Sequence, residues 1–229
     1  MQPNYPTCAA CPYEWSERVC RRPDGKGPDN CPTLVHAELK KRALEALKDP
    51  DVFEFARQAS IQEAEGYGGR DQGYARVEPI KPRIVETIEF ARRMSMTRLG
   101  IIFCVGLRRE AAIVQEILET NDFETVSILC KAGRVSKEEL DLNSSHQIDI
   151  QARRESMCNP ILQAEIANHH QIELNILLGL CVGHDSLFIK HARGYCTVLA
   201  VKDRLLGHNP LAAIYQYQSY YRRLKKPLP

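Results

Sequence analysis

Four short apolar segments alternate with helix-like segments along the second half of the chain. The first of them, LGIIFC, is a continuous apolar run, as expected for a strand that is buried on both faces of a sheet. The four segments are Leu99–Cys104, Phe123–Cys130, Leu174–Cys181 and Cys196–Lys202. Because strand–helix–strand units place successive strands parallel, this pattern predicts an α/β fold with a mainly parallel sheet of about four or five strands. We expect a Rossmann-like, doubly wound domain over residues 98–229.

Residues 34–97 have a different pattern. Apolar residues recur there at near-helical spacing, with a break at Asp49-Pro50 and a Gly/Pro-rich loop at 66–82. We therefore expect a helical region that packs on the core of the α/β domain. The first predicted strand–helix turn reads CVGLRRE. It lacks the G-x-G-x-x-G pattern, so nothing indicates a dinucleotide cofactor.

The first 31 residues contain four cysteines in the pattern C-x2-C-x8-C-x10-C, namely Cys8, Cys11, Cys20 and Cys31. Two cysteines three positions apart lie on one turn, so both sulfurs can face one centre. The segment between the last two cysteines contains two Gly and two Pro, and can fold back as a loop. Such a segment has little core of its own, and a metal would supply folding energy. We interpret residues 1–33 as a cysteine-rich metal-binding segment.

The residues beside these cysteines bear on the kind of metal. Cys11 and Cys31 are each followed by proline, a step found at cysteines that ligate iron–sulfur clusters. This favours an iron–sulfur cluster, and the [4Fe–4S] type in particular. Zinc is the alternative, because structural zinc often takes four cysteines. Structural zinc sites usually have two short C-x2-4-C pairs, however, and this segment has one.

Composition limits the compartment and the partners. The chain has nine cysteines, an odd number, and is 44% hydrophobic, which argues against a disulfide framework. No apolar run reaches the ~20 residues of a bilayer span, and the N-terminus lacks the basic and apolar regions of a secretory signal. We expect a cytoplasmic protein with reduced thiols. A net charge of +2 indicates neither nucleic acid nor a membrane surface as partner.

Four of the other five cysteines lie at the ends of predicted strands. Cys104, Cys130 and Cys181 end the first three strands, and Cys158 precedes a helix. Ligands bind open α/β sheets outside the carboxyl ends of the strands, and a helix N-terminus favours a thiolate. These four cysteines therefore form a possible second metal or substrate site. The competing interpretation is that cysteine is simply a well-buried residue. Cys196 begins its strand, so we expect a packed thiol at the opposite edge.

Charged and polar side chains follow the third and fourth strands. His184 is a candidate metal ligand or general acid/base, and would act as the proton donor of a reductive reaction. Lys202 and Arg204 are candidates for binding an anionic substrate, with solvated charges as the competing interpretation. A C-terminal aromatic cluster indicates internal packing or a subunit contact, and hence a possible homodimer. The cluster consists of Tyr215, Tyr217, Tyr220 and Tyr221.

Two parts of the sequence resemble a known family. The stretch LCVGHDSLFIKHARGYCTVLAVKDRLLGHNPLAAIY at 180–215 and the Cys31-Pro32-Thr33 step after a C-x2-C group are similar to uncharacterised cysteine-rich metal-binding proteins (domain of unknown function 1847). The resemblance implies metal binding through cysteines, with the GHDS and KDR..GHNP segments as site signatures. The implied ligands are Cys8, Cys11, Cys20 and Cys31. The resemblance implies no particular reaction.

These features together predict a metal-binding, iron–sulfur protein with a redox or reductive role. The N-terminal cluster would transfer electrons, and the strand-end thiolates would hold a second cluster or bind a small-molecule substrate. An enzyme of this kind would be an iron–sulfur-dependent oxidoreductase or lyase, and a redox partner protein is a further expectation. The alternative is a zinc-stabilised, non-enzymatic binding or metal-handling module. A third hypothesis, thiol redox chemistry, is disfavoured because no C-x-x-C lies beside a βαβ unit.

Overall fold

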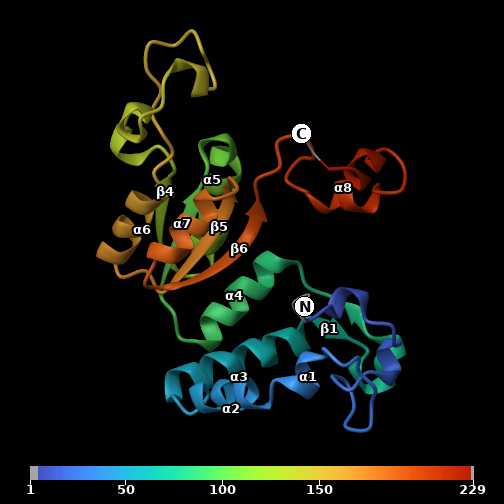
Figure 1. Cartoon of the computed structure of the whole chain (residues 1–229). Coiled ribbons are helices and arrows are strands. Elements are labelled where there is room, and N and C mark those ends of the chain that lie inside the picture. The colour runs from blue at the N-terminus through green and yellow to red at the C-terminus, as the bar shows by residue number, and fades with distance from the viewer. Residues whose placement is uncertain (1–4, 228–229) are drawn as a thin grey trace. The chain divides into compact units, whose positions relative to one another are not determined.

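The computed structural model describes residues 5–227, and the chain divides into two compact units, Met1–Glu63 and Ala64–Pro229 (Figure 1). Residues 1–4 and 228–229, which belong to the predicted segments 1–33 and 98–229, lie outside the described residues. The predicted helical region at 34–97 is divided between the two units.

The first unit consists of short helices joined by loops. Its helices are α1 (Pro32–Val35), α2 (Ala37–Ala46) and α3 (Pro50–Glu65), which runs two residues past the unit boundary. Two 3₁₀ turns, Cys8–Ala10 and Trp15–Glu17, precede them. Asp49 caps α3 by accepting hydrogen bonds from the backbone N–H groups of Asp51 and Val52. Proline at the first position of a helix loses no intrahelical bond, which explains the break predicted at Asp49-Pro50.

The first unit has no hydrophobic core among its described residues. No side chain from residue 5 to residue 61 is buried. Leu34, Leu44 and Phe53 have the spacing of a core-facing stripe, yet they are 53%, 55% and 54% exposed. Hydrophobic burial therefore contributes little to holding this unit together.

The second unit begins with a small antiparallel pair and a helix. Strand β1 (Tyr67–Gly68) pairs with β2 (Glu78–Pro79) across the glycine-rich loop. Helix α4 (Arg83–Arg93) then buries Ile88 and Ala91. The Arg83 Nε–H donates to the carbonyl oxygen of Val198, 2.6 Å away, which ties the start of α4 to the main sheet.

A four-stranded parallel sheet forms the centre of the second unit, in the order β4-β3-β5-β6. The strands are β3 (Arg98–Phe103), β4 (Glu124–Leu129), β5 (Leu174–Leu180) and β6 (Tyr195–Val201). Both ends of each strand lie within one residue of the predicted ends. The central strands β3 and β5 are buried almost throughout. The predicted α/β class and parallel sheet are thus confirmed.

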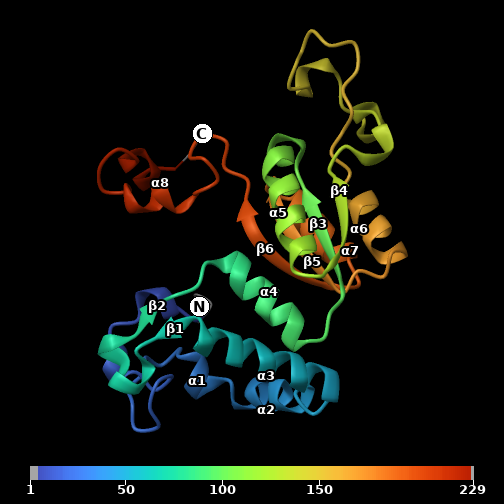
Figure 2. The same ribbon diagram turned by 180° about the vertical axis from the view of Figure 1, so that it is seen from behind.

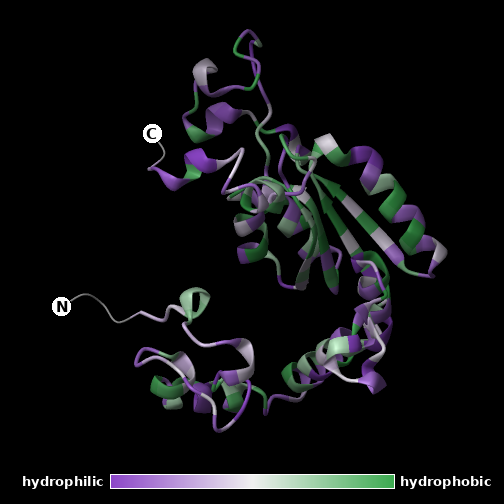
Figure 3. Cartoon of the chain, turned by 90° about the vertical axis from the view of Figure 1, so that its right-hand side faces the viewer, coloured by the Kyte–Doolittle hydropathy of each residue, from purple (hydrophilic) through white to green (hydrophobic). Residues whose placement is uncertain are grey.

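Helices cover both faces of this sheet. Helix α5 (Arg108–Thr120) lies on one face, and α6 (Pro160–His169) and α7 (His184–His191) pack together on the other (Figures 1 and 2). Figure 3 shows that the strands are mainly hydrophobic, whereas the helices mix hydrophobic and hydrophilic residues. The fully buried Phe188 of α7 packs with a cluster that includes Ile102 and Leu177.

The remaining segments lie beyond the sheet. The connection from β4 to α6 contains three 3₁₀ turns, Ala132–Arg134, Lys137–Leu140 and Ser144–His146. Between β6 and residue 227, the last residue described, the chain forms the short helix α8 (Leu211–Tyr215) and a 3₁₀ turn at Arg222–Lys225. Within residues 5–227, no helix combines the length and apolar character that crossing a bilayer requires.

Candidate functional site

The four N-terminal cysteines lie around one cavity. Cys8, Cys11, Cys20 and Cys31 all line a cavity of about 50 Å³ within the first unit. The backbone N–H of Cys11 donates to the Cys8 oxygen, 3.3 Å away, so the C-x2-C pair forms a single turn. Cys31 immediately precedes Pro32 at the start of α1. The predicted fold-back of the intervening loop therefore brings all four cysteines to the same place.

A glycine lets the chain approach one of these thiols. A Cβ atom at Gly27 would lie 3.0 Å from the Cys31 sulfur, inside normal contact distance. A larger residue there would push against a potential ligand. Across residues 5–227, no three His, Cys, Asp or Glu side chains meet in an arrangement that could hold a metal ion as it stands. The thiols thus line the cavity without converging on one point, but their number and type match a four-cysteine site.

A second group of cysteines lies at the carboxyl edge of the parallel sheet. Cys104 and Cys130 directly follow β3 and β4, whose last residues, Phe103 and Leu129, are register partners. Cys130 donates its backbone N–H to the Phe103 oxygen at 2.9 Å. The Val105 N–H lies 3.4 Å from the Cys130 sulfur. Register and hydrogen bonding therefore make Cys104 and Cys130 neighbours, as their strand-end positions predict.

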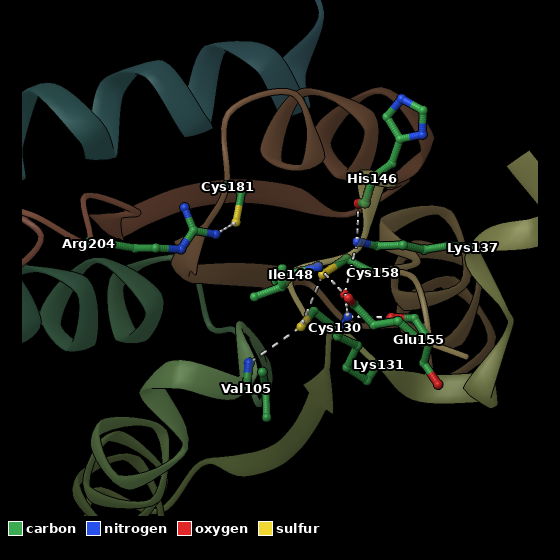
Figure 4. Close-up of polar contacts among 11 residues, drawn as sticks. Val105, Cys130, Lys131, Lys137, His146, Ile148, Glu155, Cys158, Cys181 and Arg204 are labelled. Atoms are coloured by element: carbon green, nitrogen blue, oxygen red, sulfur yellow. Dashed lines mark hydrogen bonds and ion pairs between the residues drawn. The ribbon is translucent and has the colours of Figure 1, made fainter. Parts of the chain in front are cut away.

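The long connection after β4 returns Cys158 to this edge. The backbone N–H of Asn159 donates to the Cys130 oxygen at 2.8 Å, and the Cys158 and Cys130 sulfurs are 3.7 Å apart (Figure 4). Asn159 also caps α6, because its Oδ1 accepts the Leu162 N–H at 2.9 Å. The predicted helix start at Cys158-Asn159-Pro160 is confirmed.

A network of half-buried charges holds this connection in place. Glu155 forms ion pairs with Lys137 at 2.9 Å and with Lys131 at 3.8 Å. Lys131 also donates to the Ser156 oxygen. Because Glu155 lies three residues before Cys158, these contacts fix the approach of the thiol to the sheet edge.

His184 completes the group. It is the first residue of α7, after Gly183, whose φ of 85° suits glycine. The Cys158 thiol raises the pKa of the His184 imidazole, and the imidazole lowers the pKa of Cys158, which places the two side chains near each other. His184 was predicted as a proton donor or ligand at this edge, and it lies beside a thiol that can exchange a proton with it. The thiols of Cys104, Cys130 and Cys158 and the imidazole of His184 are called the edge cluster below.

The edge cluster separates its thiols into different protonation states. Hydrogen bonding with Cys130 and then with His184 holds the pKa of Cys158 well below its ordinary value. Hydrogen bonding with Cys130 also lowers the pKa of Cys104. Hydrogen bonding with Cys104 and Cys158 raises the pKa of Cys130. The Cys158 thiol raises the pKa of His184. These shifts favour the protonated thiol at Cys130, and they favour the thiolate at Cys158 beside a protonated His184 imidazole.

The last predicted member, Cys181, has a different partner. Its sulfur accepts a hydrogen bond from the Arg204 guanidinium at 3.0 Å (Figure 4). Lys202 lies instead near Cys104, with its Nζ 3.5 Å from the position of a Cβ on Gly106. The two predicted anion-binding residues are thus at the predicted edge, each beside a cysteine. Of the four cysteines of the predicted second site, Cys104, Cys130 and Cys158 share the contacts described above, and Cys181 contacts Arg204.

Sequence reasoning missed one residue of this region and placed another correctly. Lys131 contributes positive charge near Cys158. Its position directly after Cys130 at a strand end could have identified it. Cys196 lies near the start of β6, where its thiol is 3.6 Å from the Gly194 oxygen. Burial raises the pKa of Cys196, in keeping with the predicted packed thiol.

Comparison with known proteins covers most of the second unit. The family model described as "Protein of unknown function (DUF1847)" matches residues 31–199. This range contains the whole edge cluster, and it begins at Cys31, after the first three N-terminal cysteines. "Uncharacterized protein MJ0455" of Methanocaldococcus jannaschii is 43% identical over 148 residues, which cover 65% of this chain and 72% of that protein. No solved structure matches the chain. The chain therefore belongs to the DUF1847 family.

Proposed function

We propose that the first unit is a metal-binding module that holds an iron–sulfur cluster through Cys8, Cys11, Cys20 and Cys31. The observation that carries this proposal is the single cavity lined by all four thiols. Four thiolates are the donor set of a [4Fe–4S] cluster. The C-x2-C turn and the glycine beside Cys31 leave room for the sulfurs to close on one centre.

The absence of a core in the described part of this unit supports the same proposal. No side chain from residue 5 to residue 61 is buried, so apolar packing does not account for a defined fold. A bound metal joins distant points of a chain and can supply the missing free energy, on the order of 10 kcal/mol for structural zinc. Cys8 and Cys31 are 23 residues apart by their numbers, so one shared metal would close the whole loop.

Zinc is the second candidate, because a segment without a core is what a structural zinc site stabilises. The proline after Cys11 and after Cys31 favours the cluster. With zinc, the protein would be a non-enzymatic binding or metal-handling module. With a cluster, the bound group would supply electrons for a redox or reductive reaction.

We further propose that the second unit has the Rossmann-like, doubly wound arrangement and binds a small substrate at its carboxyl edge. The strand order β4-β3-β5-β6 supports this, because successive connections leave β3 and β5 in opposite directions. Ligands of such sheets bind where the order reverses. Cys104 and Cys181 follow these two strands. Lys202 and Arg204 would attract an anionic substrate there, and His184 would donate a proton.

Metal analysis after anaerobic purification tests the identity of the metal. We expect a brown protein with about four irons and matching sulfide per chain. One zinc in a colourless protein would establish the zinc module instead. A protein that binds neither metal would overturn both candidates. A Cys196→Ser variant is the matched control and should keep the metal content of the wild type.

A further inference from the structure

We propose that Cys158 and Cys130 form a dithiol that reacts with small disulfides, with Cys158 as the attacking thiolate and Cys130 as the resolving thiol. This activity belongs to the edge cluster and does not depend on a metal in the first unit. The thiol pair lacks the C-x-x-C spacing of familiar dithiol sites. It is assembled from the end of β4 and the start of α6, 28 residues apart.

Distance is the first argument. The two sulfurs are 3.7 Å apart and both cysteines are free thiols. The hydrogen bond from the Asn159 N–H to the Cys130 oxygen, at 2.8 Å, fixes the two backbones beside each other. A mixed disulfide on Cys158 would therefore hold its sulfur within reach of Cys130, which is the condition for resolution.

Burial assigns the two roles. Cys130 is 2% exposed, whereas Cys158 is half-buried. A disulfide from solvent can therefore reach Cys158 but not Cys130. His184 and Lys131 place positive charge near Cys158, which is the environment of a reactive thiolate. Its depressed pKa agrees with this role, and the raised pKa of Cys130 agrees with a thiol that acts second.

Cys196 shows how a packed cysteine of this same unit differs. Its thiol lies 3.6 Å from a backbone oxygen, that of Gly194, and burial raises its pKa. Simple packing at a strand accounts for Cys196. Packing alone does not explain a histidine beside Cys158 or three adjacent thiols at a sheet edge where ligands bind.

The reaction balances in two steps. First, the Cys158 thiolate attacks one sulfur of the substrate disulfide, and the other sulfur leaves as a thiolate that takes the His184 proton. Second, the Cys130 thiol attacks the Cys158 sulfur 3.7 Å away, and its proton passes to the departing substrate thiolate. The second substrate thiolate leaves as the Cys130–Cys158 bond forms. The substrate gains the two electrons that the dithiol loses.

The test uses 5,5′-dithiobis(2-nitrobenzoate) on the full-length protein, with peptide mass spectrometry to locate each product. We expect a Cys130–Cys158 disulfide in the wild type. A Cys130→Ala variant should stop at a mixed disulfide on Cys158. In a Cys158→Ser variant, the rate of reaction at this edge should fall by about tenfold or more. Cys196→Ser should match the wild type.

Three results would overturn the proposal: a mixed disulfide that persists on Cys158 in the wild type, a disulfide that joins Cys104 to Cys130, or no reaction at the edge cluster. Circular dichroism checks that each variant is folded. The wild-type peptide map decides the matter even if the Cys130→Ala variant does not fold, because it needs no substitution.

Discussion

Removing the proposed metal with a chelator should speed tryptic cleavage within Met1–Glu63 by about tenfold or more, while cleavage within Ala64–Pro229 changes little. The first unit has basic residues for trypsin, among them Arg18, Arg21 and Lys26, and none of its side chains from residue 5 to residue 61 is buried. Local opening then costs little unless the metal holds the loops. The second unit keeps its own core of buried strands. Gel analysis of timed digests measures both rates.

A cysteine variant provides the control for the chelator. Cys20→Ser should be cleaved quickly without chelator, and chelator should add no further effect. Cys196→Ser should behave as the wild type in both conditions. If the first unit stays resistant after complete removal of metal, the metal is not what holds that unit together.

His184→Gln should move the midpoint of the pH profile of Cys158 alkylation upward by about one pH unit or more. The pKa of Cys158 is lowered first by Cys130 and then by His184. A thiol with a lowered pKa is ionised above that pKa, and only the thiolate reacts with iodoacetamide. Loss of the imidazolium removes part of the lowering, so the thiolate forms at higher pH. One unit corresponds to about 1.4 kcal/mol. Mass spectrometry of the Cys158 peptide gives the rates.

Two internal controls sharpen this measurement. His191→Gln, at the other end of α7, should leave the Cys158 profile unchanged. Cys196, whose pKa is raised by burial, should react only at higher pH in every variant. At a pH well above both midpoints, wild type and His184→Gln should alkylate Cys158 at similar rates. An unchanged midpoint in His184→Gln would contradict the thiolate–imidazolium pair.

The sheet and the edge proposed to bind a ligand could be predicted from the sequence, because the apolar residues of each segment identify it as a strand without reference to the rest of the chain. Strands such as β5, Leu174–Leu180, consist almost entirely of apolar residues, and a parallel sheet buried on both faces needs such runs. Once the strand ends were known, Cys104 and Cys130 had to lie near each other. The cap at Asn159 was equally local, since it depends on one side chain and the turn that follows.

The partners of the later cysteines depended on tertiary structure. Cys158 approaches Cys130 because Glu155 pairs with Lys137 and Lys131 across the long connection, and no sequence spacing reveals those pairs. Cys181 instead contacts Arg204, from the loop after another strand. The apolar stripe of α2 and α3 could be predicted from the spacing of its residues. Its exposure to solvent could not, because periodicity identifies an apolar helix face but does not say which element covers it.

Metal content of single Cys→Ser variants is the most direct test of the four-cysteine metal site. The first set replaces Cys8, Cys11, Cys20 and Cys31. The second set replaces Cys104, Cys130, Cys158 and Cys181, and serves as the control. All should be purified without oxygen and assayed for iron, sulfide and zinc per chain. We expect each variant of the first set to lose most of its metal, and each variant of the second set to keep the wild-type content. Metal that survives in the first set and is lost from the second would contradict the proposed site.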